Sequence, residues 1–236
     1  MQLFYNSEIT NTTQQFTFDK TESRHIVRVL RKTEGDTIFI TNGFGQLFTS
    51  EIEIANDKRC LVKIINFEDF DKPWNYYLHV AIAPTKLNDR FEWFLEKATE
   101  IGIDEITPII CEHSERKVIK SERLTKIIHS ASKQSLKYHI PKLNKAITFN
   151  QFINSNFEGQ LFIAHCEETQ KKSLKSQLKP SQKTTILIGP EGDFTIKEIQ
   201  QSLEHNFIPV SLGESRLRTE TAGIVAVHSV AFTNEK

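Results

Sequence analysis

The feature that most constrains the fold is an alternation of apolar runs with helical segments, which begins near residue 77 and continues to the end of the chain. Helices are expected from Asn88 or Asp89 to a stop at Gly102, from Ser121 to a point before Pro141, and from about Glu220 to Phe232. The runs that read as short buried strands are 77–83, 106–110, 161–164, 185–188 and 207–211. Such alternation predicts an α/β fold with a mostly parallel sheet covered by helices.

The first 70 residues have a different pattern, in which short β-rich segments surround a single helix. The expected strands are 16–18, 37–40, 47–54 and 60–65. The expected helix covers Thr21 to Lys32, with Ile26, Val29 and Leu30 as its apolar face. This part therefore predicts a small β-barrel. The charged segment 68–73 ends in proline, so we expect domains at residues 1–72 and 73–236.

Composition limits the class of protein. The three cysteines are odd in number and far apart, which excludes a disulfide framework and favours a reducing compartment. No HExxH or Cys/His spacing suggests a metal site, so no metal is expected. The N-terminus does not resemble a signal peptide, and no apolar run is long enough to cross a bilayer. We therefore expect a cytoplasmic protein with no membrane partner.

The net charge of zero conceals a basic stretch. Between His113 and Lys145 there are nine lysines and arginines against two acids, a local balance of +7. A basic stretch of this kind favours phosphate binding, and a solvated helix face is the alternative interpretation.

Two loops follow expected strands at the edge where open α/β sheets bind ligands. The first is Ile188-Gly189-Pro190-Glu191-Gly192-Asp193-Phe194-Thr195, in which the glycines allow close approach of a ligand or positive φ. Thr195 and Glu198 have the spacing of a capping box that opens the next helix. An ordinary tight turn is the alternative for this loop.

The second loop runs from Ser211 to Ala222 and is rich in hydroxyl groups and arginine. Ala222, Gly223 and Ala226 are small residues at the start of the last helix, which predicts that another chain segment or a ligand lies in close contact. A solvated connector is the alternative.

Together these motifs resemble the small-subunit ribosomal RNA uracil-N3 methyltransferases (RsmE type) of the SPOUT superfamily. The resemblance rests on the order of five motifs over about 200 residues. They are HIVRVLR with Gly35-Asp36, Lys86 and Arg90 with EKATEIG, Gln134-Ser135 with Pro141, IGPEG, and LGxxxLRxETA. Asp193 stands where many members carry a third glycine, Lys137 where arginine is usual, and Lys133 where glutamate precedes Gln-Ser.

The resemblance implies an N-terminal PUA-like β-barrel, a SPOUT domain with a trefoil knot, a homodimer, and S-adenosylmethionine as cofactor. By the same resemblance, the cofactor residues are Ala164, His165, Leu187, Ile188, Gly189, Glu191, Gly192, Leu212, Gly213 and Leu217.

The implied reaction is methylation of uridine N3 in 16S ribosomal RNA, as free RNA or in the small ribosomal subunit. The N3 proton must leave, so a base and a cation that stabilises the uridinate are expected. We assign the cation to Arg218 and the base to Glu220 or Glu191. A loop salt bridge and carboxylates at a helix start are the alternative interpretations.

RNA contacts are expected from the basic helix of the barrel and from the basic stretch. The expected residues are Arg24, His25, Arg28, Arg31, Lys32, Lys86, Arg90, Arg116, Lys133, Gln134 and Lys137. For His25, a structural role is an equal alternative to stacking on a base. For the whole chain, the alternatives are a non-catalytic RNA-binding protein with this fold and a SPOUT enzyme for another base or ribose.

Overall fold

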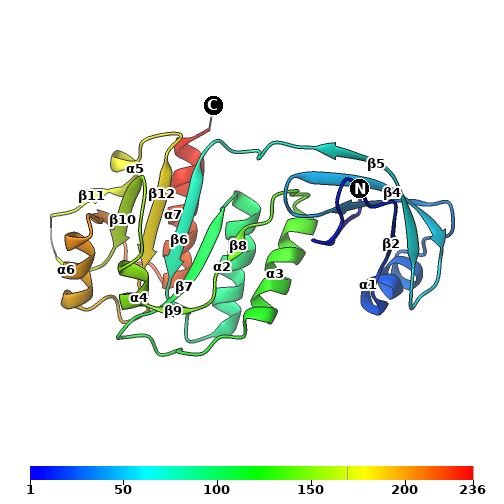
Figure 1. The fold of residues 1–236 in the computed structure, drawn as a ribbon. Coiled ribbons are helices and arrows are strands. Elements are labelled where there is room, and N and C mark those ends of the chain that lie inside the picture. Colours follow the sequence, from blue (N-terminus) through cyan, green and yellow to red (C-terminus); the bar gives the residue numbers. More distant parts are fainter. Residues whose placement is uncertain (169, 236) are drawn as a thin grey trace. The chain divides into compact units, whose positions relative to one another are not determined.

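The computed structural model describes residues 1–168 and 170–235, which divide into two units (Figure 1). The first unit comprises Met1–Pro73 with Ser132–Ile140, and the second comprises Trp74–Ala131 with Pro141–Lys236. Residues 169 and 236 fall in the predicted second domain and lie outside the described residues. The return of residues 132–140 to the first unit was not predicted.

The first unit is built on a five-stranded sheet in the order β1–β3–β4–β5–β2. Its strands are β1 (Leu3–Tyr5), β2 (Gln15–Thr17), β3 (Thr37–Thr41), β4 (Gln46–Ile54) and β5 (Leu61–Asp69). Every pair is antiparallel except β1 with β3, which is parallel. Alternate side chains of the strands point inward, so Ile38, Ile40, Phe48, Ile52 and Val62 form a buried core.

The segment 132–140 is attached to the turn between β3 and β4. The Gly45 amide donates to the Tyr138 carbonyl at 2.9 Å, and the Ile140 amide donates to the Gly43 carbonyl at 3.0 Å. Because these are backbone bonds between residues almost 100 positions apart, sequence periodicity gives no sign of them.

The predicted helix over 21–32 is shorter and less regular than expected. It consists of α1 (Lys20–Arg24) and a π-helical turn, η1 (His25–Val29), and Arg31 then adopts a left-handed φ of 54°. The wider turn changes the helical phase, so Val29 is 66% exposed while Ile26 is fully buried. Val29 was therefore wrongly assigned to the apolar face.

The second unit contains an eight-stranded sheet in which every described pair is parallel. Its main order is β11–β13–β10–β12–β6–β7–β8, and β9 also pairs with β7. The strands are β6 (Tyr77–Ile82), β7 (Glu105–Ile110), β8 (Lys142–Leu143), β9 (Ile147–Thr148), β10 (Gln160–Ala164), β11 (Lys172–Ser173), β12 (Lys183–Ile188) and β13 (Ile208–Ser211).

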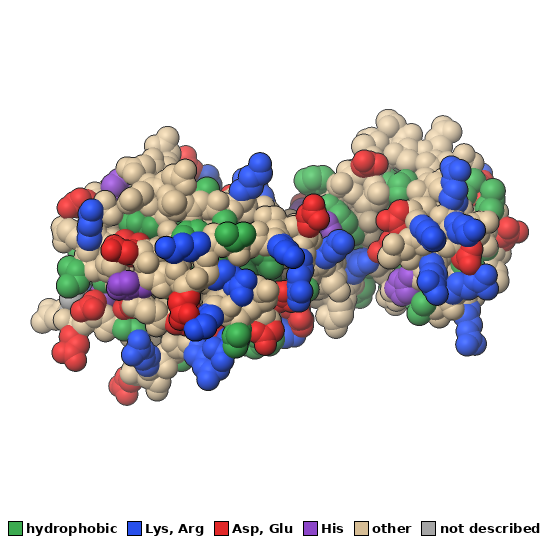
Figure 2. Space-filling model, turned by 90° about the horizontal axis from the view of Figure 1, so that it is seen from below, with side chains coloured by type: hydrophobic (Ala, Val, Ile, Leu, Met, Phe, Trp, Pro, Cys, Tyr) green, Lys and Arg blue, Asp and Glu red, His purple; other side chains and the backbone are tan. Residues whose placement is uncertain are grey.

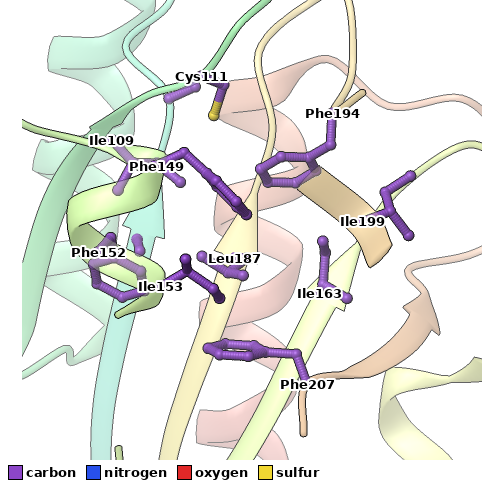
Figure 3. Packing of buried hydrophobic residues seen from close by; sticks show 12 residues of the cluster. Ile109, Cys111, Phe149, Phe152, Ile153, Ile163, Leu187, Phe194, Ile199 and Phe207 are labelled. Carbon is purple, nitrogen blue, oxygen red and sulfur yellow. The ribbon is translucent and has the colours of Figure 1, made fainter. Parts of the chain in front are cut away.

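Helices cover both faces of this sheet. They are α2 (Asn88–Ile101), α3 (Ser121–Gln134), α4 (Phe149–Ile153), α5 (Leu174–Gln177), α6 (Ile196–Glu204) and α7 (Thr219–Thr233). On one face, α4 and α6 bury Phe149, Phe152 and Ile199 against Ile163 and Leu187 of the sheet (Figure 3). On the other face, α7 packs against α2 and β6.

The helix boundaries follow their predicted signals in most cases. Gly102 ends α2 with a φ of 129°, and both hydrogen bonds of the Thr195–Glu198 capping box are present at the start of α6. The predicted cap at Asn88 or Asp89 is wrong, because Leu87 occupies the N-cap position and provides no side-chain acceptor. The predicted α/β class with a small N-terminal β-domain is confirmed.

Candidate active site

Three adjacent parallel strands of the second unit end at the same edge of the sheet. β10 ends at Ala164, β12 at Ile188 and β13 at Ser211, in the spatial order β13–β10–β12. Because their carboxyl ends lie together, the loops that follow them form one site. The Thr219 hydroxyl joins two of these loops by donating to the Gly189 carbonyl at 3.1 Å.

Two cavities lie at this edge and share five wall residues. The first, of about 450 Å³, is lined mainly by the loops after β10 and β13. The second, of about 310 Å³, is lined mainly by the loop after β12 and by residues 216–219. The shared residues are Ala164, Cys166, Arg216, Leu217 and Ala222. The shared wall makes the two cavities neighbouring parts of one candidate site.

Most of the predicted cofactor residues lie in these walls. Ala164, His165, Leu212, Gly213 and Leu217 line the first cavity. Ile188, Gly189 and Glu191 line the second, together with Ala164 and Leu217. Leu187 and Gly192 line neither cavity. The Leu187 side chain packs into the core beneath α4 and α6 (Figure 3).

The glycines of the first loop have packing roles. A Cβ at Gly189 would lie 3.0 Å from the Phe194 ring, and a Cβ at Gly192 would lie 3.1 Å from the His113 Cβ. Glycine at these positions therefore lets neighbouring side chains close over the loop. Gly213 has a φ of 137° with open space around its Cα, so its backbone conformation is what favours glycine there.

His165 is the most unusual polar group in the cavity wall. It is 7% exposed, and neither ring nitrogen has a hydrogen-bond partner. Burial and the charge of Lys171 lower the pKa of His165, while the Asp193 carboxylate opposes them. A buried neutral imidazole with no partner costs free energy, which makes His165 unusual among the residues of the cavity wall.

Two of the three predicted catalytic residues line the second cavity, and the third lies outside both cavities. Arg218 and Glu191 line the second cavity, and Arg218 is exposed. One Glu191 carboxylate oxygen already accepts the Lys86 amide at 2.9 Å. Glu220 lies in the first turn of α7, outside both cavity walls, and is 7% exposed. Its Oε1 is 3.8 Å from Arg90 Nε, while its Oε2 is buried without a partner.

The remaining RNA candidates of the second unit lie near the same loops. Lys86 Nζ pairs with Glu115 at 2.7 Å. The Arg116 guanidinium donates to the carbonyls of Thr85 and Lys86, so it braces the segment that follows β6. Arg90 lies in the first turn of α2, with its Nε 3.8 Å from Glu220 Oε1. Lys86 and Arg90 therefore lie close together in the sequence at the start of α2.

The RNA candidates of the first unit are partly committed to ion pairs. Arg28 pairs with Asp57 at 2.9 Å, Lys32 with Asp36 at 3.6 Å, and Lys133 with Glu22 at 2.8 Å. Figure 2 shows blue side chains gathered on one side of this unit.

The other candidates of this unit vary in exposure. Arg24, Arg31 and Gln134 are exposed. His25 is half-buried and its ring makes a T-shaped contact with Phe4, and burial lowers the pKa of Lys137.

Sequence reasoning missed several wall residues. Cys166, Lys171 and Arg216 line the first cavity, and Thr219 lines the second. Asp193, noted only as a departure from the family pattern, also lines the second cavity. Cys166 lies two residues beyond the expected strand 161–164, and Asp193, Arg216 and Thr219 lie within the two loops that the motifs had singled out.

Residues 1–168 and 170–235 contain neither a candidate metal site nor a candidate membrane-spanning helix. No cluster of three or more His, Cys, Asp or Glu side chains among them could hold a metal ion. Within the same residues, none of the helices combines the length and apolar character needed to cross a membrane.

A family model described as an RNA methyltransferase domain matches residues 72–231, and one described as an RNA methyltransferase PUA domain matches residues 18–65. The chain is therefore a member of the class of RNA methyltransferase-domain proteins with an attached PUA domain.

Individual relatives narrow the class. The ribosomal RNA small subunit methyltransferase E of Buchnera aphidicola is 32% identical over 222 residues, which cover 90% of this chain and 86% of that protein. The chain belongs to the ribosomal RNA small subunit methyltransferase E family, which confirms the resemblance drawn from the motifs.

Solved structures agree with this placement. A probable rRNA-methyltransferase from Porphyromonas gingivalis is 42% identical, with a TM-score of 0.91 and coverage of 99% of this chain and 98% of that one. A ribosomal RNA small subunit methyltransferase E from Neisseria gonorrhoeae, bound to S-adenosyl methionine, is 28% identical. Its TM-score is 0.81, with coverage of 97% and 96%.

Proposed function

We propose that this protein transfers a methyl group from S-adenosylmethionine to N3 of a uridine in small-subunit ribosomal RNA. Family membership supports the class of reaction, and the Neisseria gonorrhoeae relative binds this cofactor. The observation that carries the proposal for this chain is His165, a buried side chain with two unsatisfied nitrogens in the wall of the first cavity.

The walls suit the parts of the cofactor. Leu212, Leu217 and Ala222 offer apolar surface for a planar ring, and His165 offers a hydrogen-bonding group. We therefore assign the first cavity to the adenosine and the second to the reacting end. Ile188, Gly189 and Glu191, which line the second cavity, would contact the reacting end of the cofactor. When bound, S-adenosylmethionine supplies an electrophilic methyl group.

The remaining task of the protein is to orient the uridine and to accept its proton. Arg218, exposed at the second cavity, would stabilise the negative charge that develops on the base. Glu191 would accept the N3 proton, because it lines the same cavity. Glu220 remains the second candidate, since one of its buried oxygens has no partner.

The first unit would bind RNA through phosphates. Arg24 and Arg31 are exposed and absent from the described salt bridges of this unit, so they are the cations most available for this contact. We also propose that His25 and the ion-paired cations reach RNA by exchanging their partners. Lys86, Arg90 and Arg116 would approach RNA nearer the reacting base.

The proposal includes a homodimer. Helix α7 is apolar around most of its circumference, and Ile224, Val225 and Phe232 lie outside its buried face. A helix of this character at a surface favours burial against another copy. We further propose a trefoil knot formed by the loops after β12 and β13, a domain boundary at residues 72–73, and action in the cytoplasm without a metal.

The test is methyl transfer from labelled S-adenosylmethionine to small ribosomal subunits from cells that lack the enzyme, with identification of the product nucleoside. Labelled N3-methyluridine supports the proposal. A different labelled nucleoside would assign the chain to another acceptor. Absence of transfer to both subunits and naked RNA, with cofactor bound, would leave a non-catalytic RNA-binding protein.

The same assay assigns the roles of the acids. Glu191→Gln and Glu220→Gln are compared at saturating cofactor. The variant that has lost the base loses turnover, typically by 10²–10⁴-fold, while it retains cofactor affinity. Arg218→Ala is expected to lower turnover in the same way, and Arg218→Lys is expected to retain part of it.

A further inference from the structure

Asp193 occupies a backbone position that favours glycine. Its φ is 64°, in the left-handed region, and its amide closes a tight turn by donating to the Pro190 carbonyl at 2.9 Å. A side chain at such a position costs free energy compared with glycine, although aspartate tolerates it better than most residues. The side chain should therefore contribute something that glycine cannot.

The contribution is a link between two loops. Asp193 Oδ2 accepts the Cys166 amide at 2.7 Å, and Oδ1 accepts the Phe194 amide at 2.9 Å. The first bond joins the loop after β12 to the residue that follows the end of β10. Hydrogen bonds from an amide to a charged carboxylate are among the stronger ones in proteins.

The linked segment forms the wall between the cavities. Ala164 and Cys166 line both cavities, His165 lines the first, and Asp193 lines the second. A second tie comes from Lys171, whose ammonium donates to the His165 carbonyl at 2.8 Å. His165 has no side-chain hydrogen bond of its own, so the backbone on either side fixes its position.

We infer that Asp193 is a positioning residue for the cofactor: its carboxylate holds residues 164–166 so that His165 faces the ligand. The inference rests on the proposed function, because it assumes that S-adenosylmethionine occupies these cavities. Asp193 acts through the Cys166 amide and does not need to touch the cofactor. If Asp193 only shaped the turn, glycine would serve at least as well.

The test compares Asp193→Gly, Asp193→Asn and Asn206→Gly. Asn206 is an exposed residue with a φ of 65° outside both cavities, so Asn206→Gly relieves the same backbone conformation without touching the site. Cofactor binding is measured by titration calorimetry, and stability by thermal unfolding. Steady-state kinetics separate KM for the cofactor from kcat.

Asp193→Gly is expected to raise the dissociation constant and KM for S-adenosylmethionine roughly tenfold, with kcat within about twofold and an unchanged or higher melting temperature. The dissociation constant of Asp193→Asn should lie between those of the wild type and Asp193→Gly, because the amide group leaves an acceptor oxygen at only one of the two carboxylate positions. Asn206→Gly should bind as the wild type does. Hydrogen exchange at the Cys166 amide, measured without cofactor, should accelerate only in the Asp193 variants.

An Asp193→Gly variant that binds S-adenosylmethionine with wild-type affinity would overturn the inference. A variant that loses affinity and also unfolds at a lower temperature would overturn it as well, because general destabilisation would then explain the weaker binding. Unchanged exchange at the Cys166 amide would show that the link does not restrain the segment. If the wild type itself fails to bind S-adenosylmethionine, the proposed function falls and the inference with it. If the wild type and the Asp193 variants all bind S-adenosylmethionine equally well, only the inference about Asp193 fails and the proposed function stands.

Discussion

Gly223 lies where α7 crosses α2 and the sheet, and its replacement by alanine tests the close packing of this layer. A Cβ at Gly223 would lie 2.7 Å from Phe94 Cδ2 and Cε2 and 2.9 Å from Ile82 Cδ1. Phe94 and Ile82 are both fully buried. The new methyl group would therefore meet side chains that have little freedom to move.

Two opposing effects determine the size of the change. Alanine is better than glycine in a helix by about 1 kcal/mol, which favours the variant. Overpacking of a filled core typically costs about 1–3 kcal/mol. Because the new methyl group contacts two buried neighbours, we expect an overpacking cost of about 2–3 kcal/mol. After the gain from helix propensity is subtracted, the free energy of unfolding should fall by about 1–2 kcal/mol.

Equilibrium urea denaturation measures this loss, with Ser229→Ala on the same helix as the control. Phe94→Leu should create room, so the double variant Gly223→Ala/Phe94→Leu should lose less stability than the two single changes added together. Unchanged or increased stability in Gly223→Ala would refute the packing argument. Additive losses in the double variant would show that Phe94 is not the obstacle.

Three further substitutions test a helix cap, a titrating carboxylate and a link between two loops. Glu198→Ala should lower the free energy of unfolding by about 2–3 kcal/mol in urea denaturation. The reason is that buried Glu198 accepts hydrogen bonds from the amides of Thr195 and Glu112, at 2.9 and 3.0 Å. A loss below about 0.5 kcal/mol would contradict this role. Burial alone would raise the pKa of Glu105, but hydrogen bonds from Tyr77 and Asn144 lower it from 4.5 to about 2. The stability contributed by its carboxylate is thus complete above pH 4.5 and lost as the pH falls toward 2, and Glu105→Gln should flatten this part of a pH–stability profile. Thr219→Val should weaken cofactor binding several-fold by calorimetry, since it removes the bond to the Gly189 carbonyl, and unchanged binding would show that this link is dispensable.

The architecture of the second unit followed from local patterns in the sequence. Apolar runs and helical spacing located its central strands, and Gly102 and the Thr195–Glu198 pair marked helix ends that the structure confirms. These signals are local, so a single sequence contains them. The spatial order β13–β10–β12 depends on crossovers between distant segments, and the attachment of residues 132–140 depends on backbone bonds to Gly43 and Gly45.

The sequence predicted which loops form the candidate site better than it predicted which of their side chains line the cavities. The motifs identified the loops after β12 and β13, but alternation in a strand does not tell which residue turns inward at its end. Leu187 consequently packs into the core, and the neighbouring Ile188 lines the second cavity. Two features of the site could not be read from the sequence, because they depend on strand ends that meet only in the folded chain. They are the lack of hydrogen-bond partners at His165 and the hydrogen bond between Asp193 and the Cys166 amide.

If His165 marks the cofactor site, a change of its side chain should weaken the binding of S-adenosylmethionine, which calorimetric titration measures. His165→Phe keeps the ring but removes both nitrogens, and His205→Phe, outside both cavities, is the control. We predict that the wild type and the control bind the cofactor and that His165→Phe binds roughly tenfold more weakly. Equal affinity in His165→Phe and the wild type would show that His165 does not mark the cofactor site, and no binding by the wild type would show that these cavities do not hold S-adenosylmethionine.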